Sequence, residues 1–164
     1  MTIDWQEVIA LFETDDGSLP DIEIDNLSGE EVISGYEFVR NSAESICTLN
    51  PYYWSTTQNR EISIKFADNP AIHVVSGEAE SFHLCFDGIK SPRGKTIPIL
   101  GLFVYPDGLN FDYRMGSDWN LGAVQGLFEF LDALSKNFKD MQLSHTNIND
   151  DGTIFCKAFS KYSS

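Results

Sequence analysis

The sequence predicts an α+β fold: a twisted, largely antiparallel β-sheet of six or more strands with two or three helices. Apolar and polar residues alternate through much of 44–114, as in strands that bury one face. In two other segments, near the N-terminus and over 120–138, apolar residues recur every three or four positions, as on one face of a helix. The chain has 164 residues, with no internal repeat and no linker-like segment, so we expect residues 1–164 to form a single domain.

The N-terminal elements are predicted from capping signals and periodicity. Asp4 and Glu7 have the spacing of a helix cap and precede an apolar stripe, which indicates a helix over 4–13. Residues 21–25 alternate strictly, which indicates a strand with one apolar face and three carboxylates on the other. Ser28 and Glu31 form a second capping box, which indicates a helix from there to about residue 40.

Period-two patterning predicts the strands that follow. We expect strands at 61–66, 71–75 and 81–86, and a hairpin in which Pro106-Asp107-Gly108 joins 97–105 to 109–113. Asn120 is a good N-cap for the longest helix, near 120–138, which we expect to pack on the sheet. A last strand is predicted over 153–162.

The chain is acidic, and the acidity is uneven. Twenty-five Asp and Glu against 11 Lys and Arg give a formal net charge of −14, and residues 1–45 hold twelve acids and one base. Such a field repels nucleic-acid phosphate and anionic lipid and attracts basic groups, so we expect a neutral or basic protein partner, no nucleic acid and no membrane. Acidity that serves solubility alone is the alternative.

Sequence signals for export and for chemistry are weak. The N-terminus lacks the basic and apolar regions of a secretory signal, and the longest apolar stretch, 97–105, is too short to span a bilayer. The cysteines, Cys47, Cys85 and Cys156, form no CxxC pair, so we expect a cytoplasmic protein with reduced, mostly buried thiols. Known catalytic motifs are absent.

Two candidate chemical sites are interpreted as ordinary structure. His83 and Cys85 share one face of a predicted strand, but their spacing is long for a thiolate–imidazole hydrogen bond. Residues 147–154 resemble the first half of an EF-hand calcium loop, yet position 1 is Asn147 and position 12 falls on Ala158 instead of Glu. We therefore interpret 147–154 as a polar turn and expect no metal and no cofactor.

The leading functional hypothesis is a non-catalytic protein-binding domain whose acidic N-terminal third docks a basic partner. Toxin-neutralising immunity proteins are the class that this profile suggests by analogy. The predicted partner-binding residues are acids that pair with Lys or Arg, and aromatic anchors: Asp15, Asp16, Asp21, Glu23, Asp25, Glu30, Glu31, Tyr52, Tyr53 and Trp54. The alternatives are a small-molecule-binding domain with an apolar pocket, an enzyme that gathers His83, Cys85, Arg114 and an acid in one cleft, and a homodimer.

Overall fold

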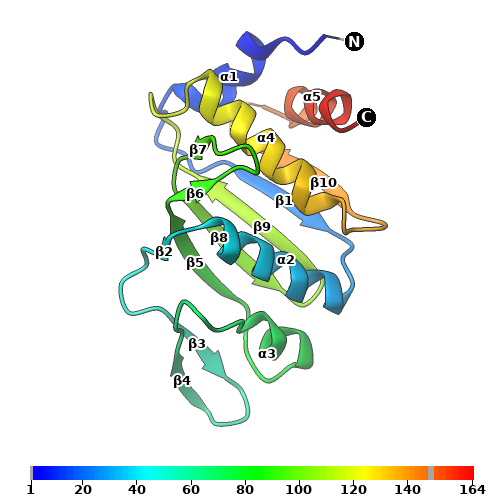
Figure 1. The fold of residues 1–164 in the computed structure, drawn as a ribbon. Helices are drawn as coiled ribbons and strands as arrows, with labels where there is room; N and C mark the ends of the chain where they lie inside the picture. Colours follow the sequence, from blue (N-terminus) through cyan, green and yellow to red (C-terminus); the bar gives the residue numbers. More distant parts are fainter. Residues whose placement is uncertain (1, 148–149) are drawn as a thin grey trace.

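The computed structural model describes residues 2–147 and 150–164. Its centre is a six-stranded sheet in which all neighbouring strands are antiparallel, in the order β10-β1-β9-β8-β5-β2 (Figure 1). The strands are β1 Asp21–Asp25, β2 Ser45–Ile46, β5 Phe82–Asp87, β8 Leu100–Tyr105, β9 Gly108–Tyr113 and β10 Gln142–Thr146. Two small hairpins flank the sheet, formed by β3 Tyr52–Ser55 with β4 Arg60–Ser63, and by β6 Ile89–Lys90 with β7 Thr96–Ile97.

Helices cover one face of this sheet. In the described part of the chain they are α1 Trp5–Glu13, α2 Gly29–Ser42, α3 Ala71–Ser76, α4 Leu121–Ser135 and α5 Thr153–Ser163. Figure 1 shows α2 and α4 lying across the sheet, α1 and α5 together at one end, and the β3–β4 hairpin with α3 at the other. Tyr36 of α2 packs edge-on against Phe82 and Phe86 of β5, and Phe130 of α4 packs against Phe111 of β9. The predicted α+β class and antiparallel sheet are confirmed.

The predicted caps form as expected. The Asp4 carboxylate accepts a hydrogen bond from the Glu7 amide, and Ser28 and Glu31 make the reciprocal bonds of a capping box. Asn120 accepts from the Ala123 amide at the start of α4, which ends at Ser135, three residues before the predicted end. The predicted hairpin is also present, since β8 and β9 pair from Leu100 and Tyr113 to Tyr105 and Gly108.

Two predicted strands are helices, which explains why the described residues form five helices instead of the two or three predicted. The segment 71–75 lies in α3, because the Asn69 side chain accepts from the Ala71 amide and Gly77, at φ +85°, ends the helix. The segment 153–162 lies in α5, where Phe155, Ala158 and Phe159 bury one helical face. The predictions were wrong at both places because short apolar runs fit either period.

The remaining differences are smaller. The stretch 97–105 divides into β7 and β8 at Pro98, which has no amide hydrogen to donate to a sheet. The segment 61–66 pairs only with β3, outside the main sheet. The cysteines are free thiols, but Cys47 is exposed, and Cys85 and Cys156 are half-buried, so the expectation of mostly buried thiols was wrong.

Candidate functional site: the open face of the sheet

The six-stranded sheet has one face turned away from the helices. Along β1, β5, β8 and β9, the residues that face the helices are almost fully buried, while most of those between them are partly or fully exposed. We call the second set the open face; its side chains are Asp21, Glu23, Asp25, His83, Cys85, Asp87, Phe103, Tyr105, Asn110 and Asp112, with Gly101 among them. None of the six strands contains Lys or Arg.

One half of the open face is acidic. Asp21, Glu23 and Asp25 lie in a row along β1, as the alternation of the sequence predicts, and Asp21 stands directly opposite Asp112 of β9. Burial raises the pKa of Asp21, and the nearby charges of Asp112 and Glu23 raise it further. Like charges thus lie side by side here, and a cation placed between them would relieve their repulsion.

At the centre of the open face, His83 of β5 binds Asp112 of β9 across the intervening strand β8. The His83 Nε2 atom lies 2.6 Å from Asp112 Oδ2, directly above Gly101. A Cβ atom at position 101 would collide with both side chains, so the glycine makes this contact possible. The Phe103 ring packs beside the imidazole at a centroid distance of 4.4 Å. The pair holds the partly buried imidazole in one orientation.

Cys85 lies next to this pair, but the surroundings do not activate it. Burial raises the pKa of the Cys85 thiol, and the charges of Cys47 and Asp112 act in the same direction. A nucleophilic cysteine needs the opposite shift. His83, Cys85 and an acid therefore share one surface, as the enzyme alternative required, while Arg114 lies beyond the end of β9 and lines a different pocket.

The other half of the open face is bordered by aromatic side chains. Tyr105 is 38% exposed and stacks on Phe103 at a centroid distance of 5.9 Å. We call the β3–β4 hairpin the aromatic arm. Beyond His83, a pocket of about 400 Å³, the arm pocket, separates this hairpin from β5. The arm pocket is lined by residues that include Leu49, Tyr52, Tyr53 and Trp54; Leu49 is 87% exposed, and Tyr52 and Trp54 are 49% and 37% exposed. The apolar border therefore begins on the sheet and continues onto the arm.

The structure divides the predicted partner-binding residues into separate groups. Asp21, Glu23 and Asp25 lie on the open face, and Tyr52 and Trp54 point out of the arm, whereas Tyr53 stacks on His73 at 5.4 Å. Asp15 and Asp16 lie in the loop before β1, where they accept hydrogen bonds from the Gly17 and Ser18 amides. Glu30 and Glu31 lie at the start of α2, and Glu31 completes the capping box with Ser28, the N-cap residue.

Sequence reasoning missed the His83–Asp112 pair and the Phe103–Tyr105 border. The two members of the pair lie on different strands, and no local pattern links them. The one signal available was Gly101 inside a strand, because an interior glycine often marks the close approach of another group.

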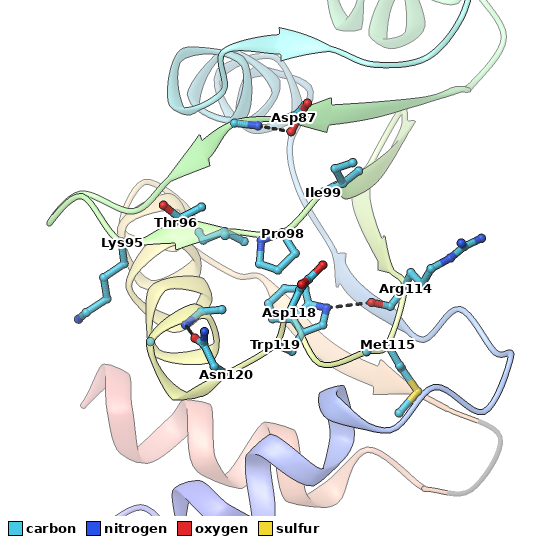
Figure 2. Close-up of a pocket in the computed structure, with 15 residues that line it drawn as sticks. Asp87, Lys95, Thr96, Pro98, Ile99, Arg114, Met115, Asp118, Trp119 and Asn120 are labelled. Carbon is cyan, nitrogen blue, oxygen red and sulfur yellow. Dashed lines mark hydrogen bonds between the residues drawn. The ribbon is translucent and has the colours of Figure 1, made fainter.

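A second pocket of about 720 Å³ lies at the end of the sheet, between the β6–β7 hairpin and the N-terminus of α4. Figure 2 shows Pro98 and Trp119 in its middle, with Lys95 and Arg114 on opposite sides. The Trp119 Nε1–H donates to the Arg114 carbonyl at 2.9 Å, which fixes the indole in the wall. We call this the Trp119 pocket; it is mainly apolar, and Ile99 at its side is 49% exposed.

The described residues hold no group of three or more His, Cys, Asp or Glu side chains that could bind a metal ion. Of the EF-hand-like stretch, residues 148 and 149 lie outside the described residues. Asn147 pairs with Asp150 in a β-bridge, and α5 follows from Thr153. None of the described helices is long and apolar enough to cross a membrane.

Comparisons with protein-family models, with curated proteins and with solved structures find no match to this chain. Its function must therefore be inferred from its own surface. That surface presents a sheet face that is acidic on one side, lined by aromatic side chains on the other, and free of Lys and Arg along its strands.

Proposed function

We propose that this protein is a non-catalytic binding domain that docks a basic protein on the open face of its sheet. The observation that carries the proposal is the composition of that face, where Asp21, Glu23, Asp25 and Asp112 lie together and no strand of the six-stranded sheet supplies a balancing Lys or Arg. The net charge of −14 adds long-range steering of a basic partner. The aromatic border supplies the large side chains that dominate binding energy in many interfaces.

The specific form that we favour is an immunity protein that neutralises a toxin. A nuclease toxin has a basic substrate cleft, and an acidic surface with aromatic anchors complements such a cleft in charge and in chemistry. The likeness is one of class, since small acidic inhibitors of this kind need no catalytic motif. The test of this form requires a nuclease toxin domain encoded beside the gene for this chain, and a locus without such a gene would count against it.

Charge reversal tests the acidic half. Asp25→Lys and Glu23→Lys should lower the association rate with that toxin domain by about tenfold at low salt, because rim charges act mainly through steering. Glu30→Lys is the matched control: the same charge change, within the same acidic third, on α2 at the helical side of the sheet. Circular dichroism confirms folding of all three variants, and stopped-flow fluorescence measures the rates.

Three results would contradict the proposal. Equal effects of Asp25→Lys and Glu30→Lys would show that only total charge matters. If the toxin domain does not bind the wild-type chain, that toxin is not the partner and the immunity function is excluded. If cells that co-express the toxin and this chain survive no better than cells that express the toxin alone, neutralisation is excluded even where binding occurs.

Truncation of an anchor tests the aromatic half. Trp54→Ala should weaken binding of the toxin domain by about 2 kcal/mol, roughly thirtyfold, if Trp54 is a central anchor. Phe66→Ala is the control, because Phe66 is 39% exposed and Trp54 37%, yet Phe66 lies outside the open face and the arm pocket. Isothermal titration calorimetry measures both, and similar losses in the two variants would count against an anchor on the arm.

A second candidate function is the binding of a small apolar molecule in the Trp119 pocket. Its volume of about 720 Å³ is within the range of ligand sites, roughly 300–1,000 Å³. The probe is anilinonaphthalene sulfonate, whose fluorescence should rise with the native protein. Gly122→Trp should abolish the rise, because Gly122 lines the pocket and a Cβ atom there meets only the Asn120 Oδ1 atom, at an ordinary contact distance of 3.5 Å. No rise, or the same rise in the variant, would exclude this candidate.

A further inference from the structure

Two cysteines face each other at the edge of the open face. Strands β2 and β5 pair with Ser45 opposite Asp87 and Ile46 opposite Phe86, and the same register places Cys47 opposite Cys85. The Cys47 amide donates to the Cys85 carbonyl at 2.8 Å, so the pairing continues one residue beyond β2. Ile46 packs toward the core, which turns the next residue, Cys47, to the same side as Cys85.

The backbone arrangement is within reach of a disulfide. Opposite residues in a hydrogen-bonded antiparallel pair have Cα atoms about 5.5 Å apart, inside the range of roughly 4.4–6.8 Å that disulfides span. Their Cβ atoms are typically about 4.5–5.5 Å apart, and a disulfide needs about 3.5–4.5 Å, so one strand must shift inward slightly. A bond formed in this way is strained and therefore easily reduced.

Strand β2 is the element that can make this shift. It has two residues and lies at the edge of the sheet, paired on one side only. The Cys85 amide donates to the Thr48 hydroxyl at 2.8 Å and not to the Cys47 carbonyl, so the ladder is already incomplete at this pair. Cys47 is exposed and accessible to an oxidant.

We propose that Cys47 and Cys85 form a reversible disulfide that fastens the β2 edge and the following segment 48–51 against β5. This segment leads into the aromatic arm and lines the pocket beside His83. The disulfide therefore sets the position of the arm relative to the open face. It does not depend on the proposed partner, because it follows from the register of two strands.

The chemistry balances with a low-molecular-weight disulfide such as oxidised glutathione as the oxidant. The Cys47 thiolate attacks one glutathione sulfur, which breaks the glutathione disulfide and releases one glutathione thiolate. The Cys85 thiolate then attacks the Cys47 sulfur, forms the protein disulfide and releases the second glutathione. The two protons lost by the cysteines are taken up by the two glutathione thiolates. Burial, with Asp87 as the second cause, raises the pKa of Cys47, so the reaction accelerates with pH.

The third cysteine provides an internal control. Cys156 lies on α5, and its sulfur is 3.6 Å from the Leu143 carbonyl of β10. Strands β10 and β2 are the opposite edges of the sheet, so Cys156 is far from both other cysteines. Cys156→Ser removes a thiol without touching the proposed pair.

The test equilibrates the folded chain with oxidised and reduced glutathione near pH 8, traps free thiols with N-ethylmaleimide, and maps the digested peptides by mass spectrometry. The wild type and Cys156→Ser should give a Cys47–Cys85 peptide pair that lacks two hydrogens, in a monomer on non-reducing gels. Cys85→Ser should instead accumulate glutathione on Cys47, because the second thiol is missing. Dithiothreitol should reverse both products.

Several outcomes would overturn the inference. They are a stable glutathione adduct on Cys47 in the wild type, a disulfide between two chains through Cys47, and two alkylated free thiols after equilibration with excess oxidised glutathione. Cys85→Ala replaces Cys85→Ser if circular dichroism shows that the serine variant is unfolded. A failure of toxin binding would leave this result untouched, since no partner takes part.

Discussion

Position 101 has no side chain, and His83 and Asp112 meet in the space above it. Gly101→Ala should therefore destabilise the protein by roughly 1–3 kcal/mol, because the new methyl group forces the pair apart in a packed setting. Its backbone is not in the left-handed region, so the cost is steric. Urea denaturation measures the loss.

The same substitution in a His83→Ala, Asp112→Ala background separates the steric effect from other causes. There the methyl group meets empty space, and the loss of stability should be much smaller than in the wild type. An equal loss in both backgrounds would mean that the glycine has another role and that the pair does not depend on it.

His145 is a second residue whose surroundings decide its chemistry. It is 2% exposed, its Nε2 lies 2.9 Å from the Tyr113 hydroxyl, and that hydroxyl donates to the Leu11 carbonyl. The hydroxyl has one proton, so His145 donates from Nε2; in the described structure its buried Nδ1 has no hydrogen-bond partner. Burial lowers the pKa of His145, with Asp150 acting weakly against this.

Stability should consequently fall as the solution is acidified below about pH 6.5, the ordinary pKa of histidine. In that window the unfolded chain binds a proton at His145 and the folded chain does not, so the free energy of unfolding decreases by up to about 1.4 kcal/mol per pH unit. The decrease ends at the lowered pKa of the folded state. His145→Gln should flatten the slope just below about pH 6.5; an unchanged slope in urea titrations would contradict the assignment.

At the scale of elements, Glu31 shows how a predicted binding residue can be structural. Its carboxylate accepts from the Ser28 amide at 2.9 Å and from the Lys139 amide at 2.8 Å, which joins α2 to the segment after α4. Glu31→Ala should cost roughly 1–2 kcal/mol of stability above about pH 5. The hydrogen bond from the Ser28 backbone, followed by that from Lys139, lowers the pKa of Glu31, so this contribution disappears on acidification.

Thermal unfolding at neutral and acid pH checks this prediction. Wild type and Glu31→Ala should differ at pH 7 and converge as the pH falls below the lowered pKa. Toxin binding by the folded variant should be unchanged, because Glu31 lies away from the open face. If Glu31→Ala weakens toxin binding without lowering stability, Glu31 contacts the partner, as the sequence predicted.

The elements that local signals predicted well are those with caps or strict alternation. Side-chain caps satisfy the amides that a helix start leaves free, so Asp4, Ser28 and Asn120 mark the helix starts in the sequence itself. The N-cap residues of α3 and α5 are Pro70 and Gly152, which make no side-chain cap hydrogen bond, and both helices were predicted as strands. Short helices depend on the packing of one apolar face, and that packing is visible only in the folded chain.

At the scale of the whole molecule, one hydrophobic cluster contains buried residues from α1, from the central sheet and from α5. We therefore predict one cooperative unfolding transition, which is the calorimetric signature of a single domain. The enthalpy should be roughly 115 kcal/mol near 60 °C for a chain of this length. Equal calorimetric and van't Hoff enthalpies in scanning calorimetry would confirm a single transition. A separate transition at lower temperature would show that part of the chain unfolds as an independent unit.

Local patterns in the chain specify the fold class, the capped helices, the β8–β9 hairpin and the row of carboxylates on β1, because hydrogen bonds between near neighbours and the alternation of a strand decide these features. Which side chains share a surface depends on how the strands are ordered in the folded sheet. The strand order places Asp112 next to that row and puts Gly101 between Asp112 and His83. Glu30 and Glu31 lie on α2, on the helical side of the sheet. Contacts between strands far apart in the chain depend on the packing of the whole sheet, and no local pattern encodes them.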